Sequence, residues 1–245
     1  MNKSLLVMLF ILLLSLMNTV IAQTDTKKFL NAKQIATVRI SAITARGDLS
    51  RLQTELHAGL DAGLTVNQIK EAIVHLYAYA GFPRSIRGLQ TFMSILDERS
   101  ARGINDQAGP ESTPVNDQLT KYERGKATLE QLTGIRESGP KTGYAAFSPI
   151  IEVFLKEHLF ADIFERDILS FAERELVTIS VLSSIGRSEP MLRSHFNICL
   201  NVGLSPAQLQ QFVNVIKLSL GKKEAKSAQI VLDELLKSKE VDTKR

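Results

Sequence analysis

The chain has 245 residues, of which 44% are hydrophobic and 23% charged, and its formal net charge is +4. This composition is typical of a globular protein with a sizeable core, and it excludes a chain that is disordered throughout. The small positive excess favours anionic ligands only weakly. With no basic stripe, no interleaved aromatic residues and no Trp, the sequence gives no support to nucleic-acid binding.

Residues 1–22 are predicted to form a secretory signal peptide. Lys3 supplies a positive start, residues 5–16 are almost unbroken apolar sequence, and Ala22 is a small residue before Gln23. The apolar run is short for a transmembrane helix, which needs about 20 residues. We therefore expect an exported protein, periplasmic or secreted, with no stable membrane insertion after cleavage; an uncleaved N-terminal anchor is the alternative.

Helix-start signals recur along the rest of the chain. A residue that can cap free backbone N–H groups is followed three positions later by Gln or Glu in four places: Asn31 with Gln34, Thr65 with Gln68, Ser170 with Glu173, and Ser205 with Gln208. No stretch shows the sustained alternation that a strand requires. The sequence therefore predicts an all-α fold.

One segment occurs twice, at residues 60–68 and 200–208: a helix end, then Gly and Leu, then a capping residue and Gln three positions on. A repeated unit buries its apolar face against its copy. The sequence therefore predicts two tandem helical repeats. Their expected bounds are 30–97 and 147–236, joined by a linker with one helix at 98–146 and followed by a charged tail at 237–245.

In the first repeat, Glu71, His75 and Tyr79 are each four positions apart and so share one face of the predicted helix. A carboxylate, an imidazole and a phenol together can supply a base, an acid and an orienting hydrogen bond. The alternative is a surface ion pair beside a half-buried Tyr. The second repeat has lost these ionisable groups, since the equivalent residues are Gln211, Val215 and Ser219.

The second repeat instead contains His195, where the first repeat has Glu55. His195 shares its helix face with the apolar or weakly polar side chains of Met191, Cys199 and Val202. Such a His is either a core residue with satisfied hydrogen bonds or a functional group. Because Cys199 is the only cysteine, an internal disulfide and redox chemistry through a cysteine pair are both excluded.

The order of these motifs resembles the carboxymuconolactone decarboxylase family. Residues 169–179 (LSFAERELVTI), 192–195 (LRSH) and 200–205 (LNVGLS) are similar to the first part of that domain, and 122–125 (YERG) to its opening helix. Residues 58–83, which end in Tyr-Ala-Gly-Phe-Pro, are similar to its second part. The resemblance implies an all-helical fold and a homo-oligomer.

The resemblance also bears on the chemistry. The related alkylhydroperoxidase-D-like branch uses a Cys-x-x-Cys-x-x-x-His motif. When the histidine of this motif is aligned with His195, its two cysteines align with Ser188 and Met191. Neither of these residues can form a thiolate. A peroxiredoxin-type activity, which annotation of the family would suggest, is therefore the weakest hypothesis.

The decarboxylase branch needs no metal and no organic cofactor. By this resemblance the catalytic candidates are His195 as the acid, with Glu71 and His75 as its partners, while Arg84 and Tyr79 would contact a small anionic substrate. The predicted function is a lyase for a small carboxylated or lactone compound. The alternative is a non-catalytic small-molecule-binding or oligomeric scaffold protein.

Overall fold

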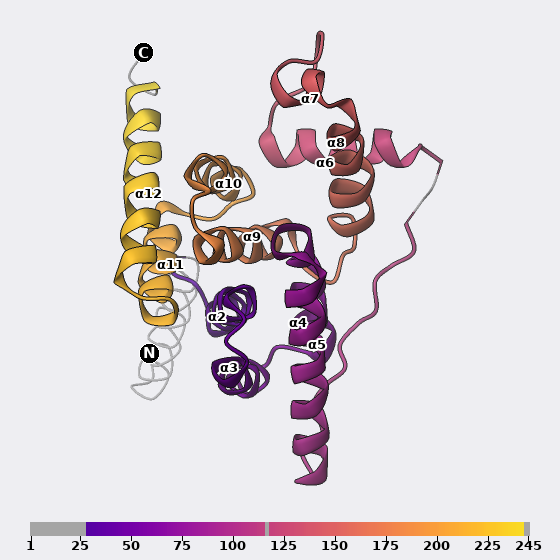
Figure 1. The fold of residues 1–245 in the computed structure, drawn as a ribbon, viewed down its shortest axis with the longest axis vertical. Helices are drawn as coiled ribbons and strands as arrows, with labels where there is room; N and C mark the ends of the chain where they lie inside the picture. The colour runs from indigo at the N-terminus through magenta and orange to yellow at the C-terminus, as the bar shows by residue number, and fades with distance from the viewer. Residues whose placement is uncertain (1–27, 116–117, 243–245) are drawn as a thin grey trace, which may run out of the picture.

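The computed structural model describes residues 28–115 and 118–242, and within these ranges the chain forms helices and no strand (Figure 1). The predicted all-α fold is confirmed. The elements in chain order are α2 (Ala32–Arg46), α3 (Leu49–Asp61), α4 (Val66–His75), α5 (Tyr77–Ala101), α6 (Lys121–Thr133), α7 (Gly143–Phe147), α8 (Pro149–Phe154), the π-helix η1 (Leu155–Ile163), α9 (Phe171–Ile185), α10 (Glu189–Asn201), α11 (Pro206–Ser219) and α12 (Lys222–Asp242).

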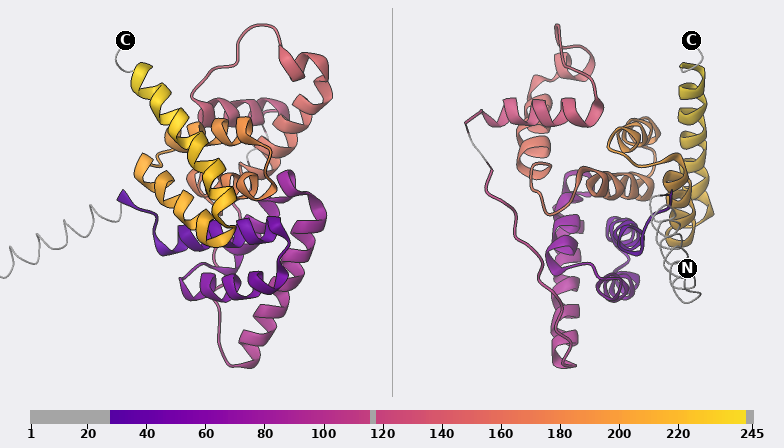
Figure 2. Two further views of the ribbon diagram at one scale, coloured as in Figure 1. Left: turned by 60° about the vertical axis from the view of Figure 1, so that its left-hand side comes forward. Right: turned by 180° about the vertical axis from the view of Figure 1, so that it is seen from behind.

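Two sets of four helices, α2–α5 and α9–α12, form the main body of the protein. In each set the second helix packs on the first and the fourth: α3 on α2 and α5, and α10 on α9 and α12. The sets join through α2 and α9, while α11 packs on α2 and α4 packs on α9 (Figures 1 and 2). The matching order of the helices accords with the predicted tandem repeat, whose common origin stays a prediction.

The predicted helix starts are confirmed in detail. Asn31, Thr65, Ser170 and Ser205 each accept from the backbone N–H three residues on, and the Gln or Glu at that position bonds back to the capping residue. The two glycines of the repeated segment, Gly63 and Gly203, have φ angles of 89° and 97°. A left-handed glycine after a helix satisfies its last carbonyl groups, so both copies end a helix in the same way.

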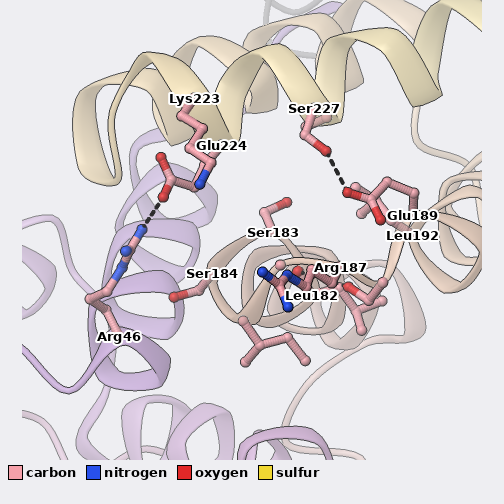
Figure 3. Close-up of a pocket in the computed structure, with 14 residues that line it drawn as sticks. Arg46, Leu182, Ser183, Ser184, Arg187, Glu189, Leu192, Lys223, Glu224 and Ser227 are labelled. Atoms are coloured by element: carbon pink, nitrogen blue, oxygen red, sulfur yellow. Dashed lines mark hydrogen bonds and ion pairs between the residues drawn. The ribbon is translucent and has the colours of Figure 1, made fainter.

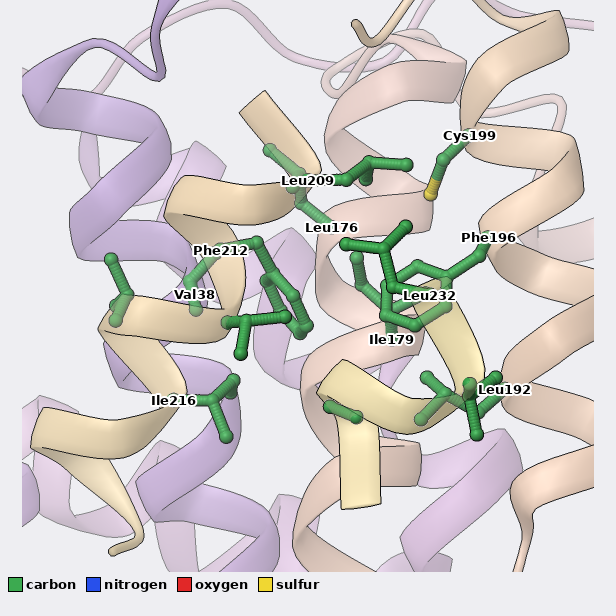
Figure 4. Close-up of a cluster of buried hydrophobic side chains, with 14 of the residues drawn as sticks. Val38, Leu176, Ile179, Leu192, Phe196, Cys199, Leu209, Phe212, Ile216 and Leu232 are labelled. Carbon is green, nitrogen blue, oxygen red and sulfur yellow. The ribbon is translucent and has the colours of Figure 1, made fainter. Parts of the chain in front are cut away.

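The central helices α2 and α9 are buried on nearly every side. Most of their Ser and Thr hydroxyl groups donate to the carbonyl four residues earlier, as Thr44 does to Ile40 at 2.7 Å and Ser183 to Ile179 at 2.7 Å. The buried hydroxyl of Ser41 has no hydrogen-bond partner among the described residues. One core cluster fills the second helix set and includes Val38 of α2 (Figure 4). A second cluster fills the first set and includes Val177 and Val181 of α9, so the core is continuous across the two sets.

The segment between the two sets contains more structure than the predicted linker. After α5, residues 104–115 run as an extended strap past the start of α4, where the N–H of Val66 donates to Gln107 O at 3.0 Å. Helix α6 is the predicted linker helix, and the short helix α7 is an additional helix at the end of the predicted linker. Helix α12 continues into the predicted charged tail as far as Asp242.

Helix α6 packs closely against η1. At Gly125 a Cβ atom would lie 1.8 Å from the carbonyl oxygen of Lys156, so only glycine permits this approach. The buried Lys156 ammonium contacts the carboxylates of Glu152 and Glu137.

The predicted signal peptide, residues 1–22, lies outside the described residues. Among the helices of residues 28–115 and 118–242, none is long and apolar enough to cross a membrane.

Candidate acid–base site

The predicted stripe of Glu71, His75 and Tyr79 faces α9 at the contact between the two helix sets. The stripe stays on one face because Leu76, between α4 and α5, keeps helical backbone angles, and the helix breaks only at Gly81, where φ is 80°. Every partner of the stripe described below comes from the second helix set or from the turn before it. The two helix sets therefore contact each other at this stripe, so residues of both sets can form one site.

Glu71 is held by two arginines. Its carboxylate, 3% exposed, accepts from Arg174 Nη2 at 2.7 Å and from Arg166 Nε at 3.0 and 3.1 Å. Arg174 is fully buried and also donates to the main-chain carbonyl of Arg166. Because both of its oxygens are engaged by guanidinium groups, Glu71 serves to hold Arg174 in the core.

His75 is fully buried and neutral. Its Nδ1 lies 3.3 Å from Arg174 Nη1, and because a guanidinium only donates, Nδ1 must be the acceptor. The proton then sits on Nε2, which donates to Thr178 Oγ1 at 2.9 Å. Burial and the charge of Arg174 hold the pKa of His75 well below its usual value. The structure thus places Arg174 between Glu71 and His75.

Tyr79 lies between the two histidines. Its ring centroid is 5.6 Å from that of His75 and 6.0 Å from that of His195, and its hydroxyl is 3.3 Å from Thr178 Oγ1. Burial and the neighbouring Glu175 carboxylate raise the pKa of Tyr79. The side chain therefore stays a neutral phenol that can donate a hydrogen bond.

The strongest acid–base pair is one that the sequence reasoning missed. His195 Nδ1 lies 2.7 Å from Glu175 Oε2; the carboxyl side chain is 0% exposed and the imidazole 14% exposed. A buried carboxylate that accepts from Nδ1–H fixes the tautomer and leaves Nε2 as the exchangeable nitrogen. This His is thus the partly exposed acid–base group of the site, held in place by Glu175.

The second oxygen of Glu175, Oε1, is buried and has no hydrogen-bond partner among the described residues. Native proteins rarely leave a buried carboxylate oxygen unpaired, and a catalytic role is one of the explanations for such an atom. Glu175 thus differs from Glu71, whose two oxygens are both engaged. The sequence signal that could have identified it is the run Glu173-Arg174-Glu175, which places charge on a helix otherwise rich in buried residues.

Arg84 does not join this cluster. It is exposed on α5, three residues after the Gly81 break, and its guanidinium lies over Gly47 at the turn between α2 and α3. The site that assembles therefore contains four of the five predicted residues, namely Glu71, His75, Tyr79 and His195. The sequence reasoning missed Arg166, Arg174, Glu175 and Thr178.

A groove of about 560 Å³ opens beside this cluster, but neither the residues of the stripe nor Glu175 and His195 belong to its described lining. Its lining includes Phe164, whose ring packs edge-on against His75 with 5.0 Å between the ring centroids, and Arg166, which contacts Glu71.

Cys199 offers no alternative chemistry, because it is fully buried and burial raises the pKa of its thiol well above the usual value. In the described part of the chain no group of His, Cys, Asp and Glu side chains could hold a metal ion.

Residues 153–234 match the model of the carboxymuconolactone decarboxylase family. Over this segment, about a third of the chain, the sequence is similar to that family. The match runs from α8 into α12 and contains Arg174, Glu175, Thr178 and His195, whereas Glu71, His75 and Tyr79 lie outside it. No curated protein matches the chain.

Proposed function

We propose that this carboxymuconolactone decarboxylase-like protein is a cofactor-independent lyase for a small carboxylated or lactone compound. The Glu175–His195 pair, with Nδ1 2.7 Å from Oε2, carries the proposal, because it leaves Nε2 of a partly exposed histidine able to exchange a proton. The family match covers both residues of this pair.

The proposed reaction breaks the bond between a carboxylate carbon and a carbon conjugated to a carbonyl group. The electron pair moves onto the carbonyl oxygen as CO₂ leaves, and the resulting enolate-like anion takes a proton at carbon from His195 Nε2. Glu175 stabilises the imidazolium that gives this proton. Tyr79, whose ring centroid is 6.0 Å from that of His195, is assigned as the neutral donor for the developing oxyanion.

These assignments change the roles first expected from the stripe. His195 keeps its proposed role as the acid, but its partner is Glu175. Glu71 and His75 become positioning residues, because Arg174 and Thr178 occupy their polar atoms. Tyr79 is proposed to contact the substrate.

One observation favours the second candidate, a non-catalytic small-molecule-binding or scaffold protein. Much of the polar network consists of buried groups that form hydrogen bonds with one another, as Arg174 does with Glu71 and His75. Such a network would also suit a protein that keeps the fold without chemistry. Peroxidase activity has no comparable support, because the buried thiol of Cys199 cannot readily form a thiolate.

The test is a steady-state assay of CO₂ release and ring opening over a panel of lactones and β-keto acids. Turnover by the natural chain and its loss in His195→Gln would support the lyase. The matched control is His57→Gln, which changes an imidazole on α3 that lies 3.7 Å from Glu98. Absence of turnover over the panel, together with saturable stabilisation of the fold by one of the compounds, would favour the binding protein.

A further inference from the structure

A second pocket, of about 340 Å³, lies at the opposite end of α9 from Glu175 (Figure 3). The C-terminal end of α2, the turn between α9 and α10, and the start of α12 form its walls. Its charged lining residues are Arg46, Arg187, Lys223, Glu189 and Glu224, which gives three cations and two carboxylates. The charged lining of the pocket therefore has a net positive charge.

Both carboxylates of the pocket already have partners. Glu224 accepts from Arg46 Nη2 at 2.7 Å, and Glu189 accepts from Ser227 Oγ at 3.0 Å. Figure 3 shows these two contacts at either side of the pocket. Arg187, in contrast, makes no hydrogen bond or ion pair within the described residues, and Lys223 lies beside Glu224 on α12. Arg187 and Lys223 are thus the cations available to a ligand.

The backbone of Arg187 adds an independent observation. Its φ angle is 54°, and it is the one residue other than glycine with a positive φ in residues 28–115 and 118–242. An arginine pays a conformational penalty there that glycine or asparagine avoids. Strain of this kind persists mainly at functional sites. Here it holds an otherwise unpaired guanidinium at the pocket.

The serines of the pocket indicate what else the ligand carries. Ser183, Ser184 and Ser188 each line it, and their hydroxyl groups donate to the main-chain carbonyls of Ile179, Ala42 and Leu182 at 2.7, 3.0 and 3.0 Å. A hydroxyl group that donates one hydrogen bond can still accept another through its oxygen. These oxygens therefore suit a ligand with hydroxyl donors of its own.

We propose that this pocket binds a small hydroxylated anion, with its carboxylate or phosphate group at Arg187 and Lys223 and its hydroxyl groups facing the serines. Guanidinium and ammonium groups both form charge-assisted hydrogen bonds with such anions. The site is separate from the acid–base pair, because Glu175 lies in the first half of α9 and Ser183 near its end. The inference therefore stands whether or not the protein is a lyase.

Calorimetric titration of the full chain with gluconate, glucose 6-phosphate and neutral glucose tests the proposal. We expect saturable binding of at least one of the two anions and none of glucose, and the comparison shows whether carboxylate or phosphate is preferred. Arg187→Asn should weaken that binding about tenfold or more, because one charge-assisted contact is lost. Arg136→Asn, which changes an exposed arginine outside the pocket, should leave it unchanged.

The variant is expected to fold, since asparagine tolerates a positive φ, so its melting temperature should not fall. Lys223→Gln gives a second, independent loss of binding. Failure of both anions to bind the natural chain would overturn the proposal. Unchanged affinity in Arg187→Asn, or glucose binding as tightly as the anions, would overturn it equally.

Discussion

Replacement of Glu71 by Leu tests the buried network at its most sensitive point. Arg174 is 0% exposed, and Glu71 is its one carboxylate partner within the described residues. Loss of one member of a buried ion pair costs about 3–5 kcal/mol, because the remaining charge stays buried without compensation. Arg166, whose side chain is 40% exposed, can turn to water and adds little to this cost.

The double variant Glu71→Leu with Arg174→Met removes both buried charges. It leaves the Arg166 carbonyl and His75 Nδ1 without their donor, at about 1 kcal/mol each. We therefore expect the double variant to be more stable than Glu71→Leu alone by about 1–3 kcal/mol, a difference obtained from these two estimates.

The assay is urea unfolding followed by circular dichroism, with the free energy of unfolding obtained by linear extrapolation. At a slope of about 2 kcal/mol per molar urea, a loss of 3–5 kcal/mol lowers the midpoint by about 1.5–2.5 M. The slope itself should not change, since the fold is kept. A double variant less stable than Glu71→Leu would refute the reasoning, because it would mean that Arg174 is not an uncompensated charge when Glu71 is absent.

Three further outcomes follow from single side chains. The pKa of His75 in the folded protein is held below its usual value of about 6.5, so at low pH the unfolded chain binds a proton that the folded protein does not. The free energy of unfolding should therefore fall between pH 7 and pH 5, by up to about 1.4 kcal/mol per pH unit. In urea titrations, His75→Gln should reduce this dependence of the unfolding free energy on pH. Gly125→Ala, which places a methyl group against the carbonyl of Lys156, should destabilise the protein by about 1–3 kcal/mol in the same assay, and an unchanged midpoint would contradict the close approach of α6 and η1. Cys199 should react with a thiol reagent in urea and hardly at all in the native state, since it is fully buried; rapid native labelling would show that the core is open.

The helices could be predicted from local signals, because capping boxes and left-handed glycines act within a few residues. The boxes at Asn31, Thr65, Ser170 and Ser205 were therefore located correctly. The same kind of box at Thr120 with Glu123 starts α6 and was not recognised. Helix α7 and the extension of α12 were missed because their sequences carry glycine or dense charge, which favour loops and fraying.

The site was predicted only in part, since its geometry depends on how distant helices pack. Periodicity correctly placed Glu71, His75 and Tyr79 on one face, but it could not show that Arg174 would take the polar atoms of the first two. For the same reason the pairing of His195 with Glu175, across α9 and α10, was not visible from spacing. Export, self-association and an anionic substrate stay predictions.

The most direct test of the acid–base pair is a kinetic cycle with Glu175→Gln, His195→Gln and the double variant, measured on the best substrate of the panel. If the two residues act as one unit, each single change should lower kcat strongly and the double variant should be no slower than His195→Gln. Effects that multiply in the double variant would mean that the two residues act independently. Full activity in His195→Gln would contradict the account altogether.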